Sequence, residues 1–196
     1  MASLNPSLII TGRALTVSEP PRPPITRTMK TIIAIDPGPT ESAILHWNGL
    51  CIAMPNILPN DQVMAWLNSE RSADDVLAIE MVASYGMAVG KEVFETVLWV
   101  GRFDDRWTVR TGNKARLVYR RDVKLHHCYS ARATDSNVRT ALVDRFGAPG
   151  KKASPGITYG LKSHLWSAFA VATYIWDTDN KGQVSVPAPL HRMTTD

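Results

Sequence analysis

The sequence lacks any long hydrophobic run: no apolar stretch approaches the about 18 residues that a membrane-spanning helix needs. It therefore predicts no helical membrane span, and we expect no membrane partner. Cysteine is nearly absent. Cys51 and Cys128 are isolated, which excludes a disulfide-stapled scaffold and the ligand spacing of a zinc site. Free thiols are typical of a reducing compartment, so we expect a cytoplasmic protein.

Charge is also sparse. Charged residues make up 20% of the chain and hydrophobic residues 44%, with a formal net charge of +4. This composition is typical of a globular protein, and 196 residues suit one domain with a sizeable core. The small positive excess is compatible with a polyanionic partner but does not establish one.

Acidic residues are almost missing from residues 1–28, which contain five prolines, three arginines and a single acid, Glu19. We expect a flexible extension over 1–28, a folded domain over 29–179 and a C-terminal tail over 180–196. The basic, acid-poor extension loosely resembles an organelle transit peptide, which leaves organelle targeting open. Met29, directly before the first predicted strand, favours the simpler interpretation that translation starts there.

Two apolar runs that each end on a carboxylate are the most informative feature present. Residues 31–35 are apolar or β-branched and stop at Asp36, where a Pro-Gly-Pro turn follows; residues 76–79 repeat the pattern and stop at Glu80. Such runs are typical of buried strands that deliver an acid to the carboxyl end of a sheet. Two acids at that edge offer the hard oxygen ligands of Mg²⁺ or Mn²⁺, although a single such acid often only caps a strand or helix.

The rest of the pattern predicts an α/β fold. Asn48-Gly49 between two apolar runs predicts a hairpin, so the chain should open with three antiparallel strands. Asn60 is the expected cap of the first helix. The expected strands cover 31–36, 42–47, 50–54, 76–80 and 116–119, and the expected helices cover 61–69, 91–107, 136–146 and 161–176. This order predicts a mixed five-stranded sheet flanked by helices.

His164 lies near the start of the last predicted helix, and Ser167 follows on the same face. If that face looks toward the ends of the first and fourth strands, His164 joins Asp36 and Glu80 in a site suited to Mg²⁺ or Mn²⁺. A lone histidine on an apolar helix is more often structural, so its candidacy depends on the two acids.

Taken in order, these motifs resemble the RuvC-type Holliday junction resolvases of the RNase H-like superfamily, and phage or prophage members most. The resemblance covers residues 29–177 and includes Ile-Asp-Pro-Gly around Asp36, Ala-Ile-Glu ending at Glu80, and the helix beginning near His164. Asp122-Val123-Lys124, followed by residues 133–138, is similar to a lysine-containing segment and a helix start of that family.

The resemblance implies an RNase H-like fold, a bacterial or phage-encoded protein, and a role in DNA recombination and repair. Its activity would be a metal-dependent endodeoxyribonuclease that resolves four-way DNA junctions by paired symmetric nicks. Asp36, Glu80 and His164 would be the catalytic residues and would ligate two Mg²⁺ or Mn²⁺ ions. Those ions would activate a water and stabilise the leaving 3′-oxygen.

The sequence departs from the family in the last helix, where two acids are common. His164 and Ser167 occupy those positions, and a serine brings no charge to a metal. Asp135, Asp177 and Asp179 are candidate substitutes, although the resemblance places Asp135 at a helix start.

The resemblance also suggests how DNA is bound. Tyr85 follows Glu80 in a loop that carries a junction-wedging aromatic in the family, although an ordinary half-buried tyrosine is equally compatible. Apolar residues on more than one face of the 91–107 helix suggest a homodimer interface, and two-fold symmetry suits paired nicks. Candidate phosphate contacts, each otherwise an ordinary surface cation, are Lys124, Arg132, Lys151, Lys152 and Lys162.

Three alternatives stay open. Asp36-Pro37-Gly38-Pro39-Thr40 fits the Asp-x-Gly-x-Thr loop of actin-like phosphotransferases, of which this chain would hold only one lobe. Ser167 in place of an acid favours a non-catalytic junction-binding protein. Another RNase H-like nuclease, acting on flaps or RNA–DNA hybrids, is poorly separated from a resolvase by the sequence.

Overall fold

A five-stranded mixed sheet forms the centre of the protein. The computed structural model describes residues 30–69, 74–83, 86 and 88–181, so the expected extension over 1–28 and most of the expected tail lie outside the described residues. The strand order is β3-β2-β1-β4-β5, with β1 to β3 antiparallel and β4 and β5 parallel to β1. The strands are β1 (Ile32–Asp36), β2 (Glu41–Trp47), β3 (Ile52–Pro59), β4 (Val76–Met81) and β5 (Arg116–Tyr119). The predicted α/β sheet with three antiparallel opening strands is confirmed.

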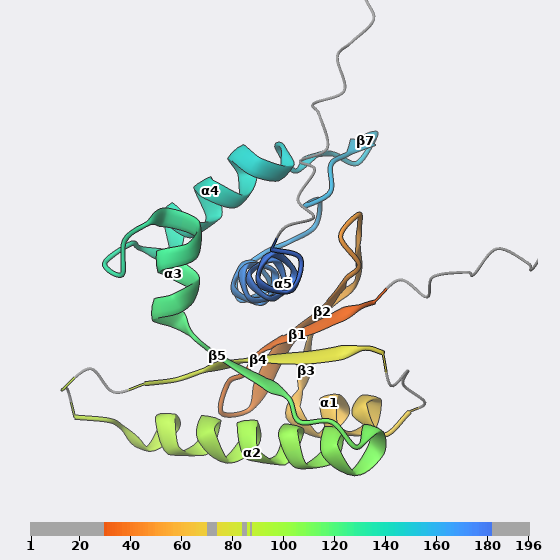
Figure 1. Cartoon of the computed structure of the whole chain (residues 1–196), viewed down its shortest axis with the longest axis vertical. Coiled ribbons are helices and arrows are strands. Elements are labelled where there is room, and N and C mark those ends of the chain that lie inside the picture. Colours follow the sequence, from red (N-terminus) through yellow and green to blue (C-terminus); the bar gives the residue numbers. More distant parts are fainter. Residues whose placement is uncertain (1–29, 70–73, 84–85, 87, 182–196) are drawn as a thin grey trace, which may run out of the picture.

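Helices cover both faces of this sheet (Figure 1). On one face lie α1 (Asn60–Leu67) and the long α2 (Lys91–Thr111). On the other lies α5 (Leu165–Asp179), which packs directly on β1, β2 and β4. Beyond α5 lie α3 (Arg120–Cys128) and α4 (Asp135–Phe146). Across the described residues, no helix is long and apolar enough to cross a bilayer.

Strand alternation assigns each side chain of β1 and β4 to one of two apolar cores. Ile33 and Ile35 pack in the core beneath α1 and α2, whereas Ile32 and Ala34 pack in the core beneath α5. Successive side chains of a strand point to opposite faces. Asp36 therefore points to the α5 face. The same alternation holds along β4, where Leu77 and Ile79 pack in the α1–α2 core and Ala78 packs in the α5 core. Glu80 therefore points to the α5 face as well.

Several predicted elements need correction. Helix α3 was not predicted, because Val123 is its one buried residue and its sequence has little apolar periodicity. The predicted loop at 151–156 contains a short hairpin of β6 (Gly150–Lys151) and β7 (Ser154–Pro155). The last helix begins at Leu165 rather than at residue 161, after a turn. Both cysteines are free, as expected.

The sequence suggested that Asn60 caps the first helix, but Pro59 holds the cap position and Asn60 is the first residue of α1. Its side chain is 2% exposed and ties the turn after Asp36 to β2. The Asn60 amide nitrogen donates to the Gly38 carbonyl at 3.0 Å, and its Oδ1 accepts the Ser42 hydroxyl at 2.6 Å. A Cβ on Gly38 would lie 2.5 Å from the Glu41 carbonyl oxygen, so this turn requires glycine. These contacts fix the chain immediately after the first strand-ending acid.

Candidate active site

Asp36 and Glu80 lie side by side at the carboxyl ends of two parallel strands. Ala34 on β1 is the register partner of Ala78 on β4, and each acid follows its alanine by two residues on the same face. Both are buried, at 8% exposed for Asp36 and 6% for Glu80. The carboxyl ends of parallel strands are the usual place for ligand sites in such sheets. The strand-end acids therefore meet as the sequence predicted.

His164 joins the two acids from the helix that packs on the sheet, not from a strand of the sheet. It is the residue immediately before α5, and its Nδ1 lies 3.0 Å from Asp36 Oδ2. Its side chain is 67% exposed, so the ring pairs with a buried carboxylate at one nitrogen and keeps access to solvent. The packing of α5 across β1 and β4 brings His164 to the strand ends, although residue 36 lies far away in sequence.

Arg120 is a fourth member that the sequence did not predict. It directly follows β5, whose Val118 is the register partner of Glu80. Its Nη1 lies 3.1 Å from Glu80 Oε1, and its Nη2 contacts the Asp135 carboxylate. The signal that revealed Asp36 and Glu80, a strand ending on a charged residue, also marks Arg120.

Burial destabilises the ionised forms of Asp36 and Glu80. Burial raises the pKa of Asp36, and the neighbouring His164 partly opposes that rise. Burial and then the nearby Asp36 charge raise the pKa of Glu80 to about 8, against the opposing effect of Arg120. A cation at this place would stabilise both ionised carboxylates.

Glu80, Arg120 and His164 line a cavity of about 380 Å³ between β4, α3, α4 and α5. Glu80 and His164 lie on its wall, and Trp166 contributes an apolar surface over which Arg139 stacks. The mixed lining combines a carboxylate corner with fixed cations. Its further polar lining residues are Arg120, Lys124, Asp135, Ser136, Arg139, Ser163 and Ser167.

The donor set fits a hard divalent cation. Among the residues that the structure describes, no three His, Cys, Asp or Glu side chains already converge tightly enough to form a ready-made metal site. Glu80 Oε2, however, is buried and has no hydrogen-bond partner. A buried carboxylate oxygen without a donor is costly unless a proton shared with the neighbouring Asp36 carboxyl, or a cation, satisfies it. Two carboxylates and an imidazole are suitable ligands for Mg²⁺ or Mn²⁺.

The remaining candidate acids do not all reach this site. Ser167 lies on the cavity wall, and Asp135 lies at the cavity edge, paired with Arg120 and 3.9 Å from Lys124 Nζ. The suggestion that Asp177 and Asp179 substitute for the missing acid is wrong. Both lie at the other end of α5, about 20 Å from His164 at 1.5 Å per residue.

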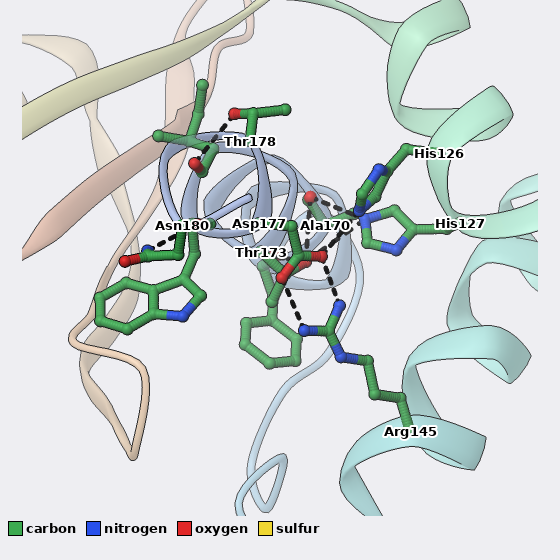
Figure 2. A network of polar contacts seen from close by, with 11 residues as sticks. His126, His127, Arg145, Ala170, Thr173, Asp177, Thr178 and Asn180 are labelled. Carbon is green, nitrogen blue, oxygen red and sulfur yellow. Dashed lines mark hydrogen bonds and ion pairs between the residues drawn. The ribbon is translucent and has the colours of Figure 1, made fainter. Parts of the chain in front are cut away.

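Ion pairs on neighbouring elements occupy both of these distant aspartates. Asp177 pairs with Arg145 of α4 at 2.7 Å and with His126 of α3 at 2.7 Å (Figure 2). Asp179 pairs with Lys30 at 2.6 Å and with Arg116 of β5. Their role is to fasten α5 to its surroundings.

The predicted DNA contacts lie on α3, the α3–α4 connection, the β6–β7 hairpin and the turn before α5. Lys124 lies in α3 and lines both the active-site cavity and a second hollow of about 380 Å³, which Arg120, Arg121 and Ala131 also line. Arg132 is exposed in the α3–α4 connection, and Lys162 is exposed in the turn before α5. Lys151 and Lys152 are exposed at the β6–β7 hairpin. Tyr85 lies outside the described residues.

Comparison with solved structures identifies the fold. The chain resembles the RuvC structure from Thermus thermophilus with a TM-score of 0.56 and T. thermophilus RuvC in complex with a Holliday junction substrate with a TM-score of 0.57. This chain has the RNase H-like fold of RuvC. Each alignment has 16% identity and covers 78% of this chain and 96% of the RuvC chain. The sequence matches no protein-family model and no curated relative.

Proposed function

We propose that this protein is a metal-dependent, structure-selective endodeoxyribonuclease that resolves four-way DNA junctions by paired symmetric nicks. One observation carries the proposal: on a RuvC-like fold, the buried Asp36 and Glu80 are neighbours, His164 contacts Asp36, and Glu80 and His164 line a cavity that basic side chains also line. A solved structure of this fold holds a Holliday junction substrate, which favours branched DNA as the substrate here.

Each of the three residues has a distinct part in the proposed reaction. Asp36, Glu80 and His164 would hold a divalent cation, which when bound supplies an acidified water and charge stabilisation for the leaving oxygen. The Asp36 carboxylate accepts from His164 Nδ1 and so orients the ring. While that hydrogen bond holds, Nε2 lies on the far edge of the ring and can exchange a proton, so His164 would join the two carboxylates around a cation only by releasing its contact with Asp36. In-line hydrolysis would leave a 5′-phosphate and a 3′-hydroxyl.

Basic side chains around the cavity are suited to the phosphates of the strand being cut. Lys124 lies on the cavity wall, and Arg132, Lys162 and the hairpin lysines Lys151 and Lys152 are candidate contacts farther out. Phosphate contacts position a duplex without reading its sequence, which suits an enzyme that selects a shape. Tyr85 stays a candidate wedge between bases.

We also propose a homodimer, with α2 as its interface. Phe94, Val97 and Leu98 form an apolar stripe that the described residues do not cover, at 64%, 37% and 54% exposed. The opposite stripe, which includes Val100, Phe103 and Trp107, is buried against the sheet. Exposed apolar surface of this kind marks interaction sites. Two active sites related by a two-fold axis would produce the paired nicks.

The deciding experiment compares labelled four-way junction, flap, RNA–DNA hybrid and linear duplex, each incubated with the protein in Mg²⁺, Mn²⁺ or EDTA. We expect symmetric paired nicks confined to the junction, and none in EDTA. Cutting of flaps or hybrids instead would select another RNase H-like nuclease. Junction binding without cleavage at any metal concentration would select a non-catalytic junction-binding protein, and ATP turnover without nuclease activity would select a phosphotransferase.

A further inference from the structure

Arg120 is built into the carboxylate centre of the proposed nuclease. It directly follows β5 as the first residue of α3, and β5 is the third of three neighbouring parallel strands at whose carboxyl ends Asp36, Glu80 and Arg120 lie. Its guanidinium bridges Glu80 Oε1, at 3.1 Å, and the Asp135 carboxylate. Glu80 thus has one carboxylate oxygen, Oε1, paired with Arg120, and a second, Oε2, that is buried and accepts no hydrogen bond from a donor group.

The charge balance at this centre favours one divalent cation over two. The carboxylates of Asp36, Glu80 and Asp135 face the permanent cations of Arg120 and Lys124, with His164 as the remaining titratable neighbour. When a bound cation keeps all three carboxylates ionised, they exceed these two fixed cations by one negative charge. A single divalent ion and a phosphodiester would restore a near-neutral centre, whereas a second ion at the same place would repel both the first ion and Arg120.

Arg120 also has donors to spare for a substrate. A guanidinium carries five N–H groups in a planar fork that matches the oxygens of a phosphate. Two of its nitrogens contact Glu80 and Asp135, and the side chain is 41% exposed and lines the cavity. An arginine held by two carboxylates is fixed in orientation, so little reorganisation is needed when a phosphate arrives.

We propose that Arg120 takes the place of one of the two metal ions, so that the centre works with a single divalent cation and a built-in guanidinium. The cation would be held by Asp36, Glu80 Oε2 and His164, and Arg120 would bind a non-bridging oxygen of the scissile phosphate. The inference rests on the proposed nuclease function. The oxygen of water forms the new bond to phosphorus while the bond from phosphorus to the 3′-oxygen breaks. The water loses one proton and the 3′-oxygen gains one.

The test counts bound metal directly. Electron paramagnetic resonance titration with Mn²⁺ is carried out on the wild-type protein, Arg120→Gln, Arg120→Lys and the neighbouring control Arg121→Gln, with circular dichroism to confirm folding. We expect one Mn²⁺ per chain for the wild type and Arg121→Gln, and a tighter or second Mn²⁺ for Arg120→Gln. Junction cleavage by Arg120→Gln should fall about 10²- to 10³-fold, as for loss of one transition-state donor. Arg120→Lys should keep the wild-type metal count with partial activity.

Two Mn²⁺ ions of similar affinity on the wild type would overturn the inference while leaving the nuclease proposal intact. Unchanged Mn²⁺ binding by Arg120→Gln would overturn it too, even if cleavage were lost. Absence of Mn²⁺ binding together with absence of junction cleavage in the wild type would remove the proposed function itself. Asp36→Asn provides the reference for a centre that has lost a ligand.

Discussion

At the scale of single residues, the site depends on ionisable groups placed where strands end. Asp36 and Glu80 are predictable from the sequence because each ends an apolar run. Arg120 follows β5 in the same way, but the sequence signal is weak there because the strand has only four residues and three of them are exposed. His164 is different. Its sequence context favours a structural residue, and only its 3.0 Å contact with Asp36 places it in the group.

Replacement of Asp36 by Asn is expected to abolish junction cleavage and to keep DNA binding. The amide is nearly the same size, but it brings no negative charge to a cation. Cleavage and gel-shift assays in Mg²⁺ measure the two properties separately, and Asp61→Asn, an exposed acid in α1, is the control. Wild-type cleavage by Asp36→Asn would contradict the assignment.

Asn60→Ala is expected to lower the free energy of unfolding by about 1–3 kcal/mol, the usual cost of leaving buried polar groups unpaired. The change removes the partners of the Ser42 hydroxyl and the Gly38 carbonyl in the turn after Asp36. Urea denaturation followed by tryptophan fluorescence measures the loss. Asn68→Ala, at an exposed position at the end of α1, should stay near wild type; an equal loss in both variants would argue against a special role for this turn.

At the scale of elements, helix α3 is not predicted by the apolar pattern of its sequence, and tertiary contacts hold it in place. The first turn of α3 lines the active-site cavity, and the last turn of α3 is hydrogen-bonded to α5. There, His127 Nε2 donates to the Ala170 carbonyl at 3.0 Å and lies 3.3 Å from the Thr173 hydroxyl (Figure 2). The adjacent His126 pairs with Asp177, which also binds Arg145 of α4. This cluster couples α3 and α4 to the helix that positions His164.

The α3–α5 junction is expected to weaken in acid. Burial lowers the pKa of His127 from 6.5 to about 4, despite its bond to Ala170, with smaller effects from His126, Asp177 and Arg145. Because the folded pKa lies below the unfolded one, the unfolded state binds the proton first. The stabilisation is therefore complete above pH 6.5 and is lost as the pH falls toward 4. The loss is at most about 3 kcal/mol.

Chemical denaturation of the wild type and His127→Gln between pH 7.5 and 4 tests this expectation. A glutamine amide can still donate to the Ala170 carbonyl but does not titrate in this range. The difference in unfolding free energy between the two proteins should shrink or change sign as the pH falls. The same slope in both proteins would show that His127 does not control the acid response. Asp177, with a pKa lowered to about 2 by its partners, should act only at still lower pH.

At the scale of the whole molecule, the sheet separates two halves of the proposed function. The α5 face holds the proposed catalytic centre and the candidate phosphate contact Lys124, whereas the opposite face is covered by α2, whose outer side carries an apolar stripe. Two copies meeting through α2 would direct their active sites away from the interface. Such an arrangement suits a substrate with two equivalent strands to cut.

Leu98→Glu is expected to convert the proposed dimer into monomers, because it places a charge in the apolar stripe of Phe94, Val97 and Leu98. Sedimentation velocity measures the oligomeric state, and a supercoiled cruciform substrate shows whether paired cuts become single nicks. Leu50→Glu is the matched control, since Leu50 is also exposed, at 65%, but lies in the β2–β3 turn. A wild-type protein that stays monomeric at micromolar concentration would contradict the dimer.

The sequence by itself determined the sheet and the positions of its two acids. Strand alternation and the turn at Asn48-Gly49 are local patterns, and they fix which face each side chain of β1 and β4 takes. Only the tertiary structure decided which distant groups join them. The packing of α5 brings His164 to Asp36, whereas Asp177 and Asp179 on the same helix are carried to the far end and paired there. Arg120 and Asn60 gained their roles in the same way, through hydrogen bonds between residues far apart in the chain, which no local periodicity encodes.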